Sequence, residues 1–158
     1  MNLLRITIAC FLFFVSTCVN AQRTKTAKAK PVAGYKVPKL TTSLGSFKDT
    51  MFISPQDALS VIGMPLKITD AKNSSYTISS YQFAYRQIVT TEDEQTGKAA
   101  FSSSIKSSLF KSSPLPDLWL NIIRERIRPG EEFIFFAVIA KDAQGRVMYS
   151  PDLKLIVK

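Results

Sequence analysis

The sequence predicts a mainly β domain, a sandwich-like antiparallel arrangement of strands with one or two short helices. Strand-like segments follow one another closely from residue 64 to the C-terminus, which is typical of an all-β domain. One segment alternates aromatic and polar residues, and residues 133–140 are consecutively apolar, as expected of a strand covered on both faces. Only two segments have the pattern of a helix, so the helices are a minor part of the fold.

The first 21 residues have the pattern of a secretory signal peptide. Arg5 precedes an apolar stretch, and Val19-Asn20-Ala21 is a small-residue cleavage site. The alternatives are an uncleaved anchor and a lipoprotein signal ending at Cys18, where Thr17 is an unfavourable preceding residue. Every version predicts a periplasmic or secreted domain, and lipidation of Cys18 would be its route to the membrane.

Residues 22–50 are predicted to be a basic, flexible linker. They hold seven basic residues and one acidic residue, a net charge of +6, whereas residues 51–158 hold 13 basic and 11 acidic residues. Pro31, Gly34 and Pro38 favour an extended chain. The linker is either a spacer or an electrostatic arm for peptidoglycan acids, anionic lipid head groups or an acidic partner. An exported chain is not expected to bind nucleic acid.

The first elements of the domain, residues 51–158, are a short helix and two strands. Ser54 can cap a helix that starts with Pro55, continues to Ile62 and ends at Gly63. Two strands are then expected, at residues 64–68 and 76–90. The apolar phase of the second strand changes along its length, which indicates a bulge near Ser79-Ser80 or a strand covered on both faces.

The remaining elements are a hairpin, a helix and the closing strands. A charged turn at 91–98 leads to a returning strand at 99–105, whereas the serine-rich stretch 102–113 fits no element. Asp117–Arg128 has helical periodicity and stops at Pro129-Gly130. After this helix we expect strands at 133–140, 146–149 and 153–157, with a turn at 142–145.

The composition excludes most catalytic chemistry. The chain has no histidine, and both of its cysteines, Cys10 and Cys18, lie inside the predicted signal. Histidine-based triads, cysteine nucleophiles, and zinc sites made of thiolate or imidazole ligands are therefore excluded for the processed chain. We predict no enzymatic activity, no cofactor and no metal site.

Three patterns that resemble sites have simpler explanations. Ser103–Lys106 and Ser108–Lys111 match S-x-x-K, but a serine-rich stretch produces that match easily. The acidic residues that could serve as paired carboxylates fall in expected turns, where acids are usually solvated; they are Glu92, Asp93, Glu94, Glu131 and Glu132. The aromatic residues Tyr81, Phe83 and Tyr85 could form a stacking platform for a small ligand or glycan, although core packing explains them better.

The candidate partner surface lies on the second helix. Arg124, Arg126 and Arg128 lie near its C-terminal end, where the helix dipole favours cations, and they could contact an acidic partner. Trp119, the only tryptophan, is expected to be buried or to serve as an interface anchor. An open sheet edge could also accept a strand of a partner protein.

The order of motifs in residues 51–158 resembles the C-terminal periplasmic domain of the gliding-motility protein GldM. The likeness begins with Ile53-Ser54-Pro55 through Gly63 and the strand Tyr76–Tyr81. It continues with Ile123–Ile127, Gly130-Glu131 and Phe133–Ile139, and ends with Asp142, Gly145-Arg146 and Pro151–Val157. The family's transmembrane helix and helical stalk have no counterpart in this sequence. The stretch 102–116 also differs from the family.

This resemblance implies a non-catalytic periplasmic β domain. In the family, this end of the protein meets outer-membrane lipoproteins of the ring that serves gliding and type IX secretion. The expected partner is therefore an envelope protein, such as an outer-membrane lipoprotein or a secretion-ring component. Motor coupling is not implied, because the segments that carry it are not matched.

Overall fold

The computed structural model describes residues 35–158, and the predicted signal peptide and the first part of the predicted linker lie outside them. The fold is mainly β with two short helices, as predicted. The helices are α1 (Pro55–Val61) and α2 (Asp117–Arg126). The strands are β1 (Leu40–Leu44), β2 (Phe47–Lys48), β3 (Thr50–Ile53), β4 (Leu66–Asp70), β5 (Ser75–Glu92), β6 (Ala99–Phe110), β7 (Glu132–Lys141), β8 (Val147–Ser150) and β9 (Leu153–Val157).

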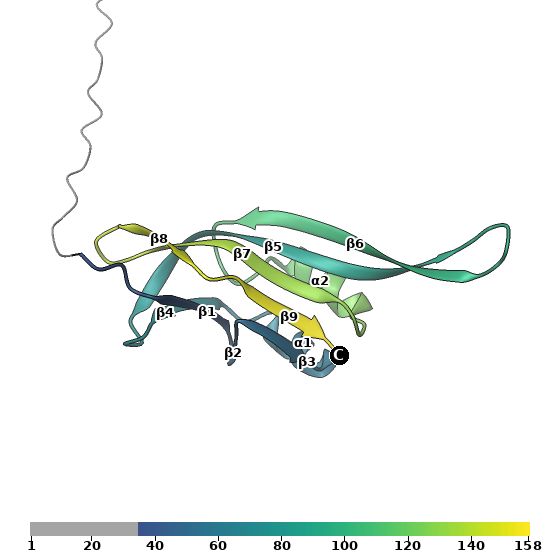
Figure 1. Cartoon of the computed structure of the whole chain (residues 1–158), viewed down its shortest axis with the longest axis horizontal. Helices are drawn as coiled ribbons and strands as arrows, with labels where there is room; N and C mark the ends of the chain where they lie inside the picture. The colour runs from purple at the N-terminus through teal and green to yellow at the C-terminus, as the bar shows by residue number, and fades with distance from the viewer. Residues whose placement is uncertain (1–34) are drawn as a thin grey trace, which may run out of the picture. The chain divides into compact units, whose positions relative to one another are not determined.

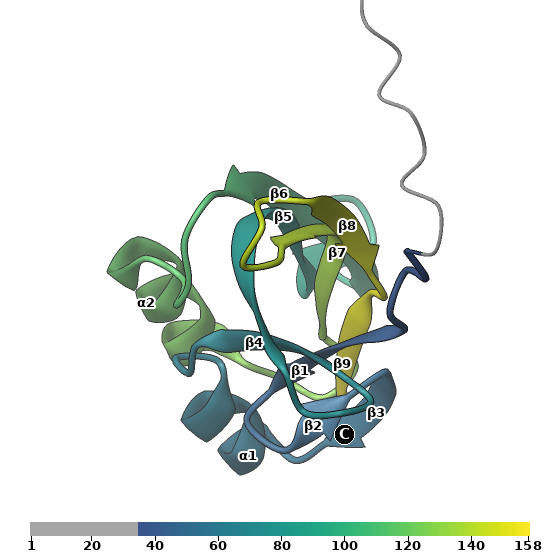
Figure 2. The same ribbon diagram turned by 90° about the vertical axis from the view of Figure 1, so that its left-hand side faces the viewer.

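The strands join in one curved sheet that is nearly closed (Figures 1 and 2). The main path has the order β2-β1-β4-β5-β7-β9-β3, while β6 pairs with β5 and β8 pairs with β7. Every pairing is antiparallel except that of β3 with β9. Both helices lie on the same side of the sheet (Figure 2).

Strand β5 is the centre of the sheet and contains a bulge, the first of the two explanations that the sequence allowed. Its pairing with β7 shifts register between Ile78 and Ser80 and again between Ser80 and Gln82. The shift brings the aromatic residues that follow onto the inner face. β5 continues past the end of its pairing with β7 and runs on to Glu92 in pairing with β6 alone.

Helix α1 begins as the sequence predicts. The Ser54 hydroxyl accepts a hydrogen bond from the Asp57 backbone N–H at 3.1 Å and donates one to the Asp57 carboxylate at 2.7 Å. Pro55 occupies the first turn, where its missing N–H leaves no bond unmade. Ala58, Val61 and Ile62 are buried, so the helix is held by its apolar side.

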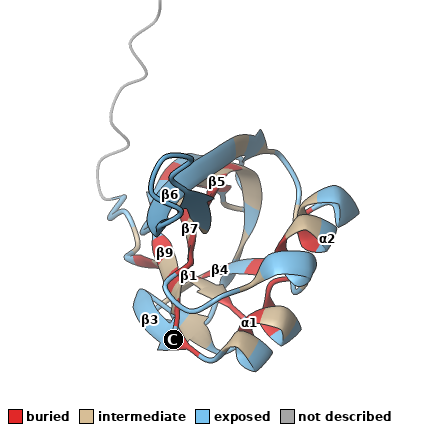
Figure 3. Ribbon diagram, turned by 90° about the vertical axis from the view of Figure 1, so that its right-hand side faces the viewer, coloured by how far each residue is buried: buried red, intermediate tan, exposed pale blue. Residues whose placement is uncertain are grey.

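Aromatic side chains dominate the core. The Phe83 ring lies 4.9 Å from the Phe135 ring and 5.3 Å from the Trp119 ring, measured between centroids. Figure 3 shows buried residues along the inner strands, whereas most of β6 is exposed. The largest fully buried side chains are Tyr81, Tyr85, Phe83, Phe133, Phe135, Leu44, Ile62, Ile68, Ile123, Leu153, Leu155 and Glu131.

The boundary of the predicted linker is wrong, because its last residues belong to the folded body. Strands β1 and β2 fall within residues 22–50, and Leu40 and Leu44 are buried. The Thr42 hydroxyl lies 2.7 Å from the Ser150 hydroxyl and donates a hydrogen bond to the Pro151 carbonyl at 2.6 Å. Burial alternates along β1, with Leu40, Thr42 and Leu44 facing inward, as expected of a strand that pairs with β4.

Helix α2 is the longer of the two, with Leu120 and Ile123 buried. In the part of the chain that the structure describes, neither helix has the length and apolar character needed to cross a bilayer.

Candidate interaction surface

The most exposed regular element is the hairpin formed by β5 and β6. Its two strands pair over twelve residues in unbroken register, from Tyr81 opposite Phe110 to Glu92 opposite Ala99. Every residue from 89 to 107 is exposed. The tip of the hairpin extends beyond the other strands (Figure 1). It therefore presents both faces and one long edge to the surroundings.

The tip is a turn in which each unusual conformation has a local cause. Asp93 accepts hydrogen bonds from the backbone N–H groups of Gln95 and Thr96, both at 2.9 Å. These bonds hold the pKa of Asp93 below its usual value. Gly97 has a φ of +63°, a conformation that glycine adopts without strain.

One face of β6 carries a row of exposed apolar side chains, which we call the β6 apolar row: Phe101, Ile105 and Leu109. Their exposed fractions are 77%, 62% and 59%. Side chains that are an even number of residues apart share a face of a strand, so these three point the same way, with Ser103 and Ser107 between them. This row of exposed apolar side chains on a projecting element makes the outer face of β6 a candidate contact surface.

The outer edge of β6 has few of the features that usually protect an edge strand. Within the described residues, β6 pairs with β5 alone. Residues 99–110 contain one charged residue, Lys106, and no proline, and their register with β5 has no bulge. Charges, prolines and bulges are the usual means of blocking strand addition. This edge therefore remains competent to pair with another strand.

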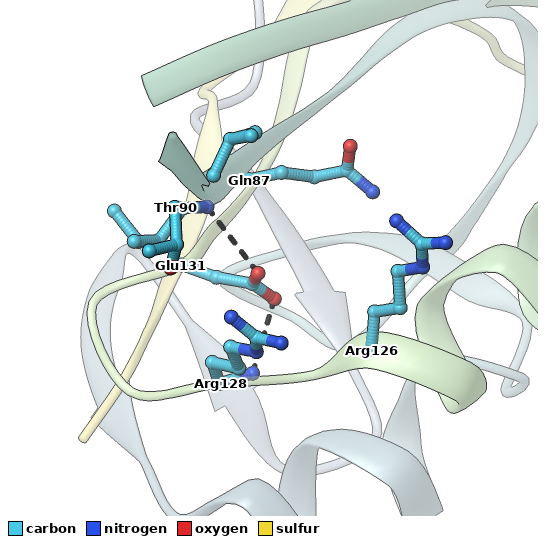
Figure 4. Close-up of a pocket in the computed structure, with 7 residues that line it drawn as sticks. Gln87, Thr90, Arg126, Arg128 and Glu131 are labelled. Carbon is cyan, nitrogen blue, oxygen red and sulfur yellow. Dashed lines mark hydrogen bonds between the residues drawn. The ribbon is translucent and has the colours of Figure 1, made fainter. Parts of the chain in front are cut away.

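A small hollow lies between the outer part of β5 and the end of α2. It has a volume of 220 Å³, and Gln87, Thr90, Arg126, Arg128 and Glu131 are among the residues that line it (Figure 4). The two arginine side chains are exposed.

Glu131 is a buried carboxylate at the base of this hollow. It accepts hydrogen bonds from the Tyr85 hydroxyl at 2.5 Å, the Ile88 backbone N–H at 3.3 Å and the Arg128 backbone N–H at 3.1 Å. Burial, followed by the contact with Glu131, raises the pKa of Tyr85 above its ordinary value. With both oxygens engaged, the carboxylate fastens the segment after α2 to β5.

The prediction that Glu131 and Glu132 are solvated turn residues is wrong. Glu132 is also buried, and its carboxylate lies 2.9 Å from the Lys154 ammonium and 3.5 Å from the Arg86 guanidinium. The two glutamates have separate partners, so they do not converge as a catalytic pair. Apart from the Arg128 N–H, the partner groups of both glutamates lie on β5 and β9, which is why the neighbouring sequence gave no sign of burial.

The predicted surface on α2 is divided in the structure. The predicted helix end at Arg128 is wrong, because α2 ends at Arg126. The Arg124 guanidinium lies against Gly63 just after α1, whereas Arg126 and Arg128 line the hollow beside the hairpin. Trp119 is half-buried, and its ring packs edge-on against Phe83. The arginines are thus exposed but do not form one patch.

Two other candidates from the sequence are excluded by geometry. Tyr81, Phe83 and Tyr85 are at most 1% exposed, so they cannot form a stacking platform for a glycan or small ligand. Ser103 and Lys106 lie on a strand and are three residues apart, so they point to opposite faces. An S-x-x-K pair needs a helical turn to bring the amine to the hydroxyl.

The β6 apolar row is the feature that sequence reasoning missed. The many serines hid the strand, although the spacing of its three apolar residues was a readable signal of a single face. No protein-family model matches the chain, and no curated protein matches it. The described residues also hold no group of three or more acidic, histidine or cysteine side chains placed to bind a metal ion.

Proposed function

We propose that this protein is an exported, non-catalytic interaction module of the cell envelope, and that the β5–β6 hairpin is its contact surface. The observation that carries the proposal is the combination, on β6, of an open edge and an exposed apolar row. Strand addition at such an edge uses backbone hydrogen bonds for affinity and alternate side chains for specificity. No reactive side chain is needed for this function.

The export part of the proposal is supported by the N-terminal sequence pattern. The narrower form, an accessory of gliding or type IX secretion machinery that contacts an outer-membrane lipoprotein or ring component, is supported by the resemblance to the GldM domain. Fractionation of the native cell and N-terminal sequencing test the first part. We expect the protein in the envelope or medium with Gln22 as its first residue, and a cytoplasmic protein that retains Met1 would contradict it.

The contact surface is tested by affinity purification from the native envelope under mild conditions. Phe101→Lys places a charge in the β6 apolar row, and Tyr149→Lys is the matched control, because Tyr149 is equally exposed but lies on β8. We expect the wild type and the control to retain the same envelope partner and Phe101→Lys to lose it. Equal recovery by both variants would contradict the assignment of the hairpin.

A further inference from the structure

We propose that β6 pairs with β6 of a second copy of this chain, about a two-fold axis through Ile105. This inference rests on the proposed role of the hairpin and names the occupant of its edge. A two-fold interface brings the same patch of each copy together, so the patch must be complementary to itself. The β6 apolar row meets this requirement, because Phe101 and Leu109 lie four residues before and four residues after Ile105.

The register of such a pair follows directly from antiparallel geometry. With Ile105 opposite Ile105 of the second copy, Phe101 lies opposite Leu109 and Ser103 lies opposite Ser107. Directly opposed residues share a face, so the apolar rows of both copies join into one continuous apolar surface. A shift of the pairing by two residues would place apolar side chains opposite serines and lose this match.

The other face of β6 is also compatible with the pair. There, Lys106 lies opposite Ser104 of the second copy, so the only charged side chain of the strand does not face its own copy. Ser102 lies opposite Ser108, a small polar pair that fits a closely paired sheet. Neither face therefore places like charges directly opposite each other.

Pairing with a second copy is a better explanation for the unprotected edge of β6 than pairing with an unrelated strand. An unrelated partner would need its own apolar residues at matching positions, whereas a second copy supplies them, because Phe101 and Leu109 are equally spaced about Ile105. The unbroken twelve-residue register with β5 keeps β6 regular over the whole length that the symmetric pairing would use.

Disulfide cross-linking tests this register directly. The full chain is used with Cys10 and Cys18 changed to serine, which leaves a background without thiols. Ile105→Cys places one thiol on the axis, where paired Cα atoms would lie about 4.5–5.5 Å apart, within the range of a disulfide. Ser107→Cys is the matched control, since two copies of residue 107 would be about 14 Å apart at ~3.4 Å per residue.

The expected result is a dimer in sedimentation equilibrium and oxidative cross-linking of Ile105→Cys but not of Ser107→Cys. Combining Ser103→Cys with Ser107→Cys should restore cross-linking, because these positions face each other. Ile105→Lys should weaken the dimer at least tenfold, with Val147→Lys on β8 as the exposed control.

Three results would overturn the inference. They are a monomer at all accessible concentrations, cross-linking of Ser107→Cys as efficient as that of Ile105→Cys, and a dimer unaffected by Ile105→Lys. A monomer whose hairpin variants still lose an envelope partner would overturn the pairing of two copies but leave the proposed function standing. If the chain is a monomer and Phe101→Lys recovers the envelope partner as well as the control does, the hairpin has neither role.

Discussion

Glu131→Gln tests whether the buried carboxylate holds the segment after α2 against β5. One carboxylate oxygen faces the Ile88 N–H, and the other faces the Arg128 N–H and the Tyr85 hydroxyl. Whichever way the new amide turns, its NH₂ group meets one of these backbone donors. That donor is left without an acceptor, and the remaining bonds lose their charge, so we expect a loss of about 2 kcal/mol in the free energy of unfolding.

Urea unfolding followed by the fluorescence of Trp119, the only tryptophan, measures this loss. Glu94→Gln is the control, because Glu94 is exposed at the hairpin tip and should change stability by less than about 0.5 kcal/mol. Tyr85→Phe completes a double-mutant cycle, in which a coupling of at least about 0.5 kcal/mol with Glu131→Gln is expected. If Glu131→Gln were as stable as Glu94→Gln, the carboxylate would not be a structural anchor.

Three further predictions concern the folded body and are checked by the same unfolding measurement. Thr42→Val should lower the free energy of unfolding by about 1–2 kcal/mol, because it removes a buried hydroxyl that bonds to the Ser150 hydroxyl and the Pro151 carbonyl. Unchanged stability would contradict the assignment of β1 to the folded body. Phe83→Ala should cost about 3–5 kcal/mol through the cavity it leaves, and a loss below about 1 kcal/mol would place that ring outside the core. Burial raises the pKa of Tyr81 to about 12 and also raises that of Tyr85, so both tyrosines ionise more readily in the unfolded chain. The contribution of the two buried tyrosines to the free energy of unfolding is therefore fully present below pH ~10 and declines as the pH rises from about 10 towards 12, at about 1.4 kcal/mol per pH unit for each tyrosine. Tyr81→Phe should reduce this slope of stability against pH, and an unchanged slope would contradict the raised pKa of Tyr81.

Local signals predicted the elements that depend on neighbouring residues. Ser54, Pro55 and Gly63 bracket α1 because capping and helix termination are determined within a few residues. The change of phase in β5 correctly indicated the bulge near Ser79-Ser80, because the side-chain period of a strand is two. The apolar run that became β7 is a central strand paired at both edges, but the prediction that both of its faces are covered is wrong, because Ile134 and Phe136 are only partly buried and Ala137 is exposed.

Features that depend on distant residues could not be predicted in the same way. β1 is a short strand of leucine, threonine and serine that is stable only beside β4, more than twenty residues later. The burial of Glu131 depends on Tyr85, 46 residues earlier in the chain. The serine-rich β6 is a strand because β5 supplies its hydrogen-bond partners, which matters more than its own propensity.

Site-specific photo-cross-linking in the native envelope tests the central claim most directly. A photoreactive amino acid at Ser103, on the face of β6 that carries its apolar row, should give a defined protein adduct, either a second copy of this chain or an envelope partner. The same group at Leu118, an exposed residue of α2, should give none. Absence of an adduct at Ser103, or an equal yield at Leu118, would contradict the assignment of the β5–β6 hairpin as the contact surface.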